Sequence, residues 1–148
     1  MFNADGLVWI GRRIGVADDT EGHGVWWQMP QGGIDEGEEP LAAARRELEE
    51  ETSVRSADYL GETDWITYDL PPDLVGKTWK GRYRGQRIKF FAFKFTGEES
   101  EIDVTVPGHT QEFADWRWEA IERTPELIVS FKRHVYEAVV EAFAGNVG

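Results

Sequence analysis

Short runs of apolar residues alternate with polar turns along most of the chain, and this pattern predicts a series of β-strands. An Asn-Ala-Asp-Gly turn at residues 3–6 precedes the first run, and a proline ends the second. The run that begins at Ile88 alternates partly with a period of two, as expected for a strand. We expect strands at residues 7–10, 25–29, 59–68, 88–95 and 113–118.

The C-terminal region predicts one long helix, over residues 124–143. Thr124 is suited to the N-cap position and Pro125 to the first helical position. The apolar stripe of this helix is expected to comprise Leu127, Phe131, Val135, Ala138 and Ala142.

A shorter helix is predicted within residues 32–54, directly after a glycine-rich turn. Pro40 fits its first turn. Leu41, Ala44 and Leu48 share one face, which should pack on the sheet. Strands mixed with two helices, without a repeat or a linker, indicate a single α/β domain.

Glu47, Glu50 and Glu51 lie on one face of this shorter helix, beside its apolar face. Each exposed pair of like charges at this spacing costs roughly a few tenths of a kcal/mol. A solvated acidic surface is one explanation. The other is a bound cation, because hard oxygen ligands without cysteine or histidine suit Mg²⁺ or Mn²⁺ better than zinc.

The composition narrows the classes of function. The chain has 148 residues, 41% of them hydrophobic, which is enough for the core of one domain over residues 1–148. Its net charge of −12 disfavours non-specific nucleic-acid binding, because such binding depends on neutralising phosphates. The absence of cysteine excludes disulfides and thiolate sites. No apolar run approaches the ~18 residues of a membrane span and no signal peptide is visible, so we expect a soluble cytoplasmic protein.

Residues 32–54 resemble the Nudix box, the signature of the Nudix hydrolase superfamily, with the pattern G-x5-E-x7-R-E-U-x-E-E-x-G-U, where U is bulky and apolar. Ser53 departs from it, because it stands where the final glycine belongs. That glycine usually adopts a left-handed, helix-ending conformation, which costs another residue roughly 1 kcal/mol. The matching positions are Gly32, Glu38, Arg46, Glu47, Leu48, Glu50, Glu51 and Val54.

Segments outside the box resemble one Nudix subgroup, the bacterial RNA pyrophosphohydrolases and the related dinucleoside polyphosphate hydrolases. This resemblance implies the Nudix fold, an α/β/α sandwich around a mixed β-sheet. In this family a strand normally precedes the turn at residues 3–6, whereas here only Met1 and Phe2 do. We therefore hypothesise a chain shortened at its N-terminus, which lacks its usual first strand and exposes a sheet edge. The segments are residues 27–33, 68–71, 83–86 with 89–91, 112–113 with 116–118, and 131–133 with 135–136.

The resemblance implies hydrolysis of a nucleoside diphosphate derivative by attack of water on phosphorus. Glu112, in the loop before the strand at 113–118, would reach the metal ions that the glutamates of the box bind. The alternative is that Glu112 is an acidic residue exposed on the surface. Glu112, Glu51 and Glu47 all remain candidates for the base that deprotonates water. The metal ligands implied by the resemblance are Glu47, Glu50, Glu51, Glu112 and the carbonyl oxygen of Gly32.

Five residues are candidates for substrate contact. Lys89 has apolar neighbours in a predicted strand, so it faces solvent or meets a phosphate, and the resemblance favours the phosphate. Tyr83 either stacks on a nucleobase or belongs to the core. Arg13 contacts phosphate or forms part of a solvated basic pair, while Gln28 and Gln31 are expected to line the cleft.

Two substrates stay open: the 5′-triphosphate end of RNA, which would release pyrophosphate, and a dinucleoside polyphosphate such as diadenosine tetraphosphate. The acidic charge favours the small nucleotide, whereas recognition of an RNA end needs few phosphate contacts. Hydrolysis of a different nucleoside diphosphate derivative also stays open, as does a non-catalytic nucleotide-binding domain. The intact set of Glu47, Glu50 and Glu51 argues against the non-catalytic domain.

Overall fold

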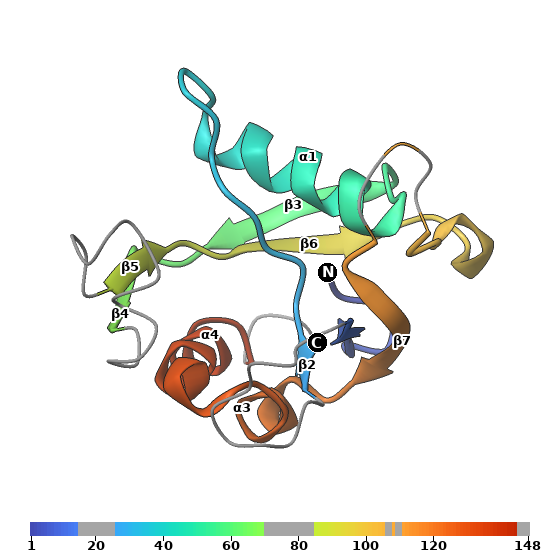
Figure 1. The fold of residues 1–148 in the computed structure, drawn as a ribbon. Helices are drawn as coiled ribbons and strands as arrows, with labels where there is room; N and C mark the ends of the chain where they lie inside the picture. Colours follow the sequence, from blue (N-terminus) through green and yellow to red (C-terminus); the bar gives the residue numbers. More distant parts are fainter. Residues whose placement is uncertain (15–25, 70–84, 106–107, 109–110, 145–148) are drawn as a thin grey trace.

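Antiparallel strand pairs form the sheet of the described chain, which comprises residues 1–14, 26–69, 85–105, 108 and 111–144 of this computed structural model (Figure 1). The strands are β1 (Val8–Arg13), β2 (Trp27–Gln28), β3 (Ala57–Glu62), β4 (Ile66–Asp69), β5 (Gly85–Ile88), β6 (Phe91–Phe95) and β7 (Phe113–Glu119). β1 pairs with both β2 and β7, β3 pairs with β6, and β4 pairs with β5. The first strand, predicted at residues 7–10, extends to Arg13 and so includes the basic residues Arg12 and Arg13.

Phe2 joins the strands β2, β1 and β7 to the pair β3 and β6. It bridges Val8 of β1 in antiparallel and Lys94 of β6 in parallel orientation. Its N–H donates to the carbonyl oxygen of Phe93 at 2.7 Å, and its own carbonyl accepts from the N–H of Phe95 at 2.7 Å. Strand directions are therefore mixed, as the family resemblance predicts.

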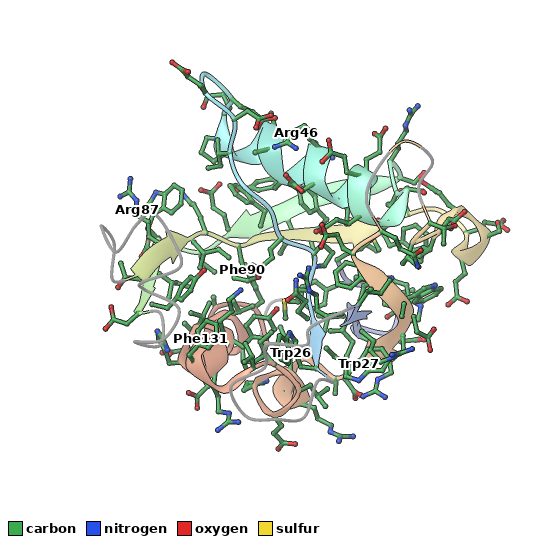
Figure 2. The ribbon with its side chains drawn as sticks, in the orientation of Figure 1. Trp26, Trp27, Arg46, Arg87, Phe90 and Phe131 are labelled. Carbon is green, nitrogen blue, oxygen red and sulfur yellow. The ribbon has the colours of Figure 1, made fainter. Side chains whose placement is uncertain are left out.

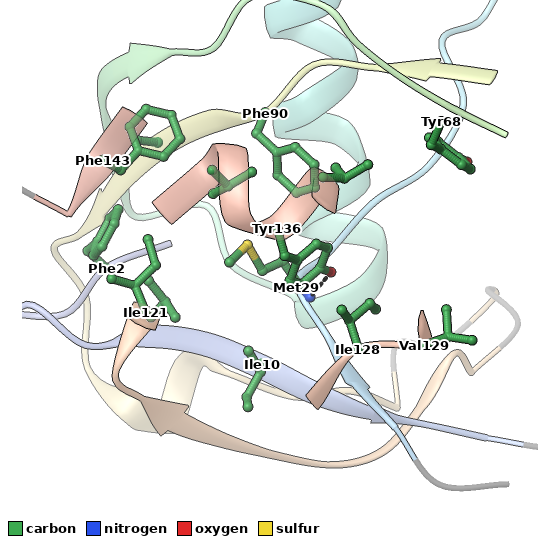
Figure 3. Packing of buried hydrophobic residues seen from close by; sticks show 14 residues of the cluster. Phe2, Ile10, Met29, Tyr68, Phe90, Ile121, Ile128, Val129, Tyr136 and Phe143 are labelled. Carbon is green, nitrogen blue, oxygen red and sulfur yellow. Dashed lines mark hydrogen bonds between the residues drawn. The ribbon is translucent and has the colours of Figure 1, made fainter. Parts of the chain in front are cut away.

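Helices cover both faces of this sheet. In Figure 1, α1 (Pro40–Thr52) lies on one side of β3 and β6, and α4 (Arg133–Phe143) lies on the other. Alternation along β1 matches this arrangement, because Val8 and Ile10 belong to the hydrophobic cluster of α4 and Trp9 belongs to that of α1. Figure 3 shows the α4 cluster, in which the Tyr136 hydroxyl accepts a hydrogen bond from the Met29 N–H. The predicted three-layer α/β/α arrangement is confirmed.

The helix predicted within the Nudix-like box is α1, and it ends as the sequence predicts. Ser53 adopts a left-handed conformation with φ of 69°, at the position where the pattern has glycine. Its N–H donates to the carbonyl oxygen of Glu49 at 2.8 Å, and its hydroxyl donates to that of Asp103 at 2.9 Å. These hydrogen bonds help to offset the strain of the left-handed backbone.

The strands predicted at residues 59–68 and 88–95 are each divided in two. Thr63 and Phe90 lie opposite one another at the two breaks. The Thr63 N–H donates to the Phe90 carbonyl at 2.9 Å, whereas the Phe90 N–H donates to the Thr63 hydroxyl at 3.0 Å instead of to a backbone oxygen. Because a side chain replaces one backbone acceptor, the ladder of β3 and β6 stops and resumes as β4 and β5.

The single C-terminal helix predicted over residues 124–143 is wrong. The chain forms a short helix, α3 (Thr124–Leu127), and leaves it at Ile128, whose backbone is extended; this break lets Ile128 and Val129 enter the core. Thr124 is not the N-cap but a buried helical residue whose hydroxyl donates to the Ile121 carbonyl.

Among the described residues, no helix is long and apolar enough to cross a membrane. The 3-10 turns are η2 (Glu99–Glu101), η3 (Ile121–Arg123) and η4 (Ser130–Lys132). In α4 the buried residues are Val135, Tyr136, Val139 and Phe143, of which only Val135 was in the predicted stripe.

Candidate active site

A cavity of about 390 Å³ gathers charged side chains from distant parts of the sequence, and we call it the active-site cavity. Three carboxylates line it: Glu47 and Glu51 from α1, and Glu112 from the segment before β7. Two cations, Arg13 from the end of β1 and Lys132 from η4, line it as well. The remaining lining residues are Trp26, Gln28, Gln31, Gly32, Val129 and Phe131.

Glu51 is the most deeply buried of these carboxylates, with 7% of its surface exposed. Its Oε2 accepts a hydrogen bond from the backbone N–H of Gln31 at 3.0 Å, which ties α1 to the glycine-rich turn. Burial raises the pKa of Glu51 to about 9, and the negative charges of Glu47 and Glu112 add to this effect. Glu47 and Glu112 are therefore close enough to Glu51 to influence its ionisation.

Gly32 and Glu47 make the closest approach in the site. A Cβ atom at position 32 would overlap the carboxylate of Glu47, whereas one at Gly33 would meet open space. The backbone can pass so close to this side chain only because residue 32 is glycine. Burial raises the pKa of Glu47 too, against the opposing effect of Arg46.

Arg46 organises the acidic face from outside the cavity (Figure 2). Its guanidinium donates to Glu38 at 2.8 and 3.0 Å, to Glu47 at 2.8 Å and to Glu50 at 3.0 Å. It also donates to the carbonyl oxygen of Gly33 at 2.8 Å. Arg46 and Glu38, the arginine and the first glutamate of the box, therefore hold the glycine-rich turn against α1. Within the described chain, Glu50 does not line the active-site cavity.

Glu112 pairs with Arg13 at 2.6 Å, although 99 positions separate them in the sequence. The Ile14 N–H donates to the Glu112 carbonyl at 3.0 Å and holds the two segments together. The structure thus brings two of the residues singled out in the sequence, Arg13 and Glu112, together at the active-site cavity. Gln28 and Gln31 also line it, and the side-chain Oε1 of Gln31 is buried without a hydrogen-bond partner among the described residues.

Lys89 lies in a second, larger cavity of about 790 Å³, which we call the α1 cavity. Gln31, Gly32 and Glu47 line both cavities, so the two adjoin. Lys89 is not within a strand, because it lies in the break between β5 and β6. Its Nζ pairs with Glu62 at 2.6 Å. Tyr83, the predicted stacking residue, lies outside the described residues.

Sequence reasoning missed Trp26, Phe131 and Lys132 as site residues. Figure 2 shows Trp26 and Phe131 on the α3 and α4 side of the sheet, and both line the active-site cavity. Burial, and to a lesser degree the charge of Arg13, lowers the pKa of Lys132 to about 8. The available signal was a lysine directly after an aromatic residue, Phe131, but the prediction of one continuous helix assigned Phe131 to its apolar stripe.

The carboxylates suit a hard cation by their chemistry. Within the described ranges, no group of three or more His, Cys, Asp or Glu side chains could hold a metal ion between them. Arg46 engages the carboxylates of Glu47 and Glu50, and Arg13 engages that of Glu112. Glu51 has no cationic partner among these pairs, and its pKa is raised mainly by burial and further by the negative charges of Glu47 and Glu112. A bound cation would supply the compensation that this donor set lacks.

Comparisons with known proteins show which sequences and structures this chain resembles. A family model described as the NUDIX domain matches residues 1–139. The RNA pyrophosphohydrolase of Rhodopseudomonas palustris strain BisB18 is 58% identical over 147 residues, covering 97% of this chain and 83% of its own. That of Bradyrhizobium sp. strain ORS 278 is 55% identical over 152 residues, covering 100% and 90%.

Solved structures share the fold at much lower identity. The Escherichia coli dihydroneopterin triphosphate pyrophosphohydrolase has a TM-score of 0.65 at 19% identity, over 94% of this chain and 86% of its own. A binary complex of the Caenorhabditis elegans Ap4A hydrolase has a TM-score of 0.58 at 16% identity, over 93% and 86%.

Proposed function

Because the chain belongs to the Nudix family, we propose that it is an RNA pyrophosphohydrolase, which removes pyrophosphate from the 5′ end of RNA. The resemblance noted in residues 32–54 is confirmed by the family match over residues 1–139. The observation that carries the proposal is the gathering of three carboxylates and two cations on one cavity. Relatives more than half identical over nearly the whole chain carry this activity in their names.

The two cations would bind the triphosphate. Arg13 is held towards the cavity by Glu112, and a guanidinium can contact two phosphate oxygens at once. Lys132 presents a compact positive charge from the opposite segment. Local positive charge of this kind offsets the net charge of −12, which would otherwise repel the substrate.

The carboxylates would hold a divalent cation, Mg²⁺ or Mn²⁺. When bound, such an ion neutralises phosphate charge and activates water. We assign Glu47, Glu51 and Glu112 as ligands from the cavity wall, with Glu50 and the Gly32 carbonyl as further members of the set. Because Arg46 and Arg13 engage Glu47, Glu50 and Glu112 in this structure, these side chains would have to turn from their arginine partners to meet at one ion. Glu51 gains most from a cation, since its carboxylate is buried beside two like charges.

The role of general base is assigned to one of Glu112, Glu51 and Glu47, and kinetics can separate them. A ligand replaced by glutamine raises the Mg²⁺ concentration needed for half-maximal rate. A base replaced by glutamine lowers kcat at saturating Mg²⁺ and removes the acidic limb of the pH–rate profile. If all three variants only weaken Mg²⁺ binding, none of them is the base.

The decisive experiment measures pyrophosphate release from 5′-triphosphorylated RNA with Mg²⁺. We expect Glu51→Gln to lose at least about a hundredfold in rate, because a cation contributes several kcal/mol. Glu49→Gln is the matched control: Glu49 lies on the same helix but pairs with the exposed Arg55 at 3.1 Å. Equal rates for the two variants would refute the site.

Substrate competition tests the choice of RNA. Triphosphorylated RNA and diadenosine tetraphosphate are compared side by side at equal concentration. Faster cleavage of the RNA supports the proposal. Cleavage of the dinucleotide alone, or of a nucleotide sugar alone, would overturn it, and no metal-dependent cleavage of any of them would indicate a non-catalytic domain.

We further propose that residues 1–148 act as one domain in the cytoplasm. Both hydrophobic clusters pack on the same sheet, and the cavity draws residues from β1, α1 and η4 together. Limited proteolysis should therefore yield no active fragment that lacks β1 or η4, the first and last of these segments in the chain. A stable active fragment without η4 would contradict the single-domain proposal.

A further inference from the structure

The α1 cavity is large and mostly apolar, and the proposed chemistry uses only Gly32 and Glu47, at the boundary that it shares with the active-site cavity. Its volume of about 790 Å³ falls in the range of sites that bind small organic molecules. Pro40, Ala43 and Ala44 of α1 form one wall, and Phe91 and Phe93 of β6 form another. It meets the active-site cavity at Gln31, Gly32 and Glu47, so a ligand in one cavity can continue into the other.

An exposed aromatic residue and two cations line one side of this cavity. Trp65 is 40% exposed, and the guanidinium carbon of Arg87 lies 4.9 Å from the centroid of its ring. The Nζ of Lys89 lies 5.7 Å from the same ring. Lys89 is neutralised by Glu62, whereas Arg87 has no ion-pair partner in the described part of the chain. Figure 2 shows Arg87 near the end of β5, away from the acidic helix face around Arg46.

This combination suits a nucleotide better than an apolar side chain or a lipid. An exposed indole offers a flat face for a nucleobase, and stacking of this kind accepts any base. An arginine beside it carries the positive charge that a backbone phosphate needs. The wholly apolar partner that would bury Trp65 would also have to bury the charge of Arg87, which is costly.

We infer that the α1 cavity binds the RNA chain downstream of its 5′ end, with one base stacked on Trp65 and a phosphate at Arg87. The inference rests on the proposed function, because an RNA substrate supplies a chain long enough to leave the active-site cavity. It adds a binding site for the body of the RNA to the site for its triphosphate. Affinity should therefore increase with RNA length, and the increase should depend on Trp65.

The test compares two triphosphorylated substrates, a dinucleotide and a single-stranded octanucleotide. In Trp65→Ala we expect the KM for the octanucleotide to rise about tenfold, the usual effect of losing one stacked base, with kcat unchanged. The KM for the dinucleotide should change less than about twofold. Arg87→Gln should act in the same direction, and Trp65→Phe should restore most of the affinity, because it keeps an aromatic face. An unchanged KM for the octanucleotide, or an equal rise for both substrates, would overturn the inference.

Arg55→Gln is the charge-matched control, since Arg55 has 80% of its side chain exposed and lines neither cavity among the described residues. It should leave both KM values unchanged. Thermal unfolding of each variant separates loss of binding from loss of folding.

Direct binding keeps this inference distinguishable from the proposed function. Fluorescence anisotropy measures the Kd of a labelled octanucleotide with a 5′-hydroxyl end, which cannot be hydrolysed. A Kd raised about tenfold in Trp65→Ala supports the site even if the wild-type protein fails to hydrolyse RNA. Equal Kd values for the wild type and Trp65→Ala would refute the site even if hydrolysis proceeds, and would leave the cavity to a different partner.

Discussion

Replacing Glu51 with glutamine should stabilise the protein in the absence of divalent cations, although it removes a proposed metal ligand. Burial and the charges of Glu47 and Glu112 raise the pKa of Glu51 from 4.5 to about 9. Unfolding returns this pKa to its ordinary value, so between pH 4.5 and about 9 the folded protein binds more protons than the unfolded chain. The free energy of unfolding therefore falls as the pH rises through this window.

The size of the effect follows from the same shift. At pH 7, which is 2.5 units above 4.5, the deprotonation of Glu51 favours the unfolded chain by about 3 kcal/mol. A glutamine amide is neutral in both states, and its oxygen can still accept the hydrogen bond from the Gln31 N–H. Glu51→Gln should therefore recover about 1–3 kcal/mol at pH 7 and much less at pH 5.

Urea unfolding with a chelator present, at pH 5, 7 and 8.5, measures this gain. The control Glu49→Gln should show no such trend, because Glu49 is 45% exposed at its side chain and pairs with Arg55. Added Mg²⁺ should stabilise the wild type and not Glu51→Gln, since only a site that binds the ion gains from mass action. A gain that is equal at all three pH values, or a loss of stability at pH 8.5, would refute the reasoning.

Three further predictions concern single positions. Gly32→Ala should slow hydrolysis at least about tenfold, because its Cβ would displace the carboxylate end of Glu47. Its cost in stability should stay under about 1 kcal/mol, because the end of a flexible side chain can move aside, and Gly33→Ala should change neither property. Rate measurements and urea unfolding check this, and equal rates for the two variants would contradict the close approach. Ser53→Gly should relieve about 1 kcal/mol of left-handed strain but lose the side-chain hydrogen bond, so the free energy of unfolding in urea should change by less than about 1 kcal/mol. A loss of more than about 2 kcal/mol would contradict this account. Lys132, whose pKa is lowered to about 8, loses its charge above that pH, so kcat/KM for triphosphorylated RNA should fall as the pH rises through 8. Lys132→Arg should lack this fall, and a pH profile identical to that of the wild type would exclude a phosphate contact.

Local pattern was sufficient for the features that depend on a few neighbouring residues. The helical spacing of Glu47, Glu50 and Glu51 predicts that they share a face, and they do lie along α1. The box also predicts that the residue after α1 turns left-handed, and Ser53 adopts this conformation. Such features could be predicted because the backbone hydrogen bonds and side-chain spacing that produce them lie within one or two helical turns.

Only the tertiary structure decided what faces that helix. Glu51 enters the active-site cavity while its neighbour Glu50 pairs with Arg46, a difference that depends on where the glycine-rich turn packs. Arg13 and Glu112 meet across 99 positions, and Lys132 reaches the cavity because the chain leaves its helical path at Ile128 to bury apolar side chains. Periodicity specifies the faces of an element, but packing between distant elements determines which charges lie together, and the chemistry of this site depends on that packing.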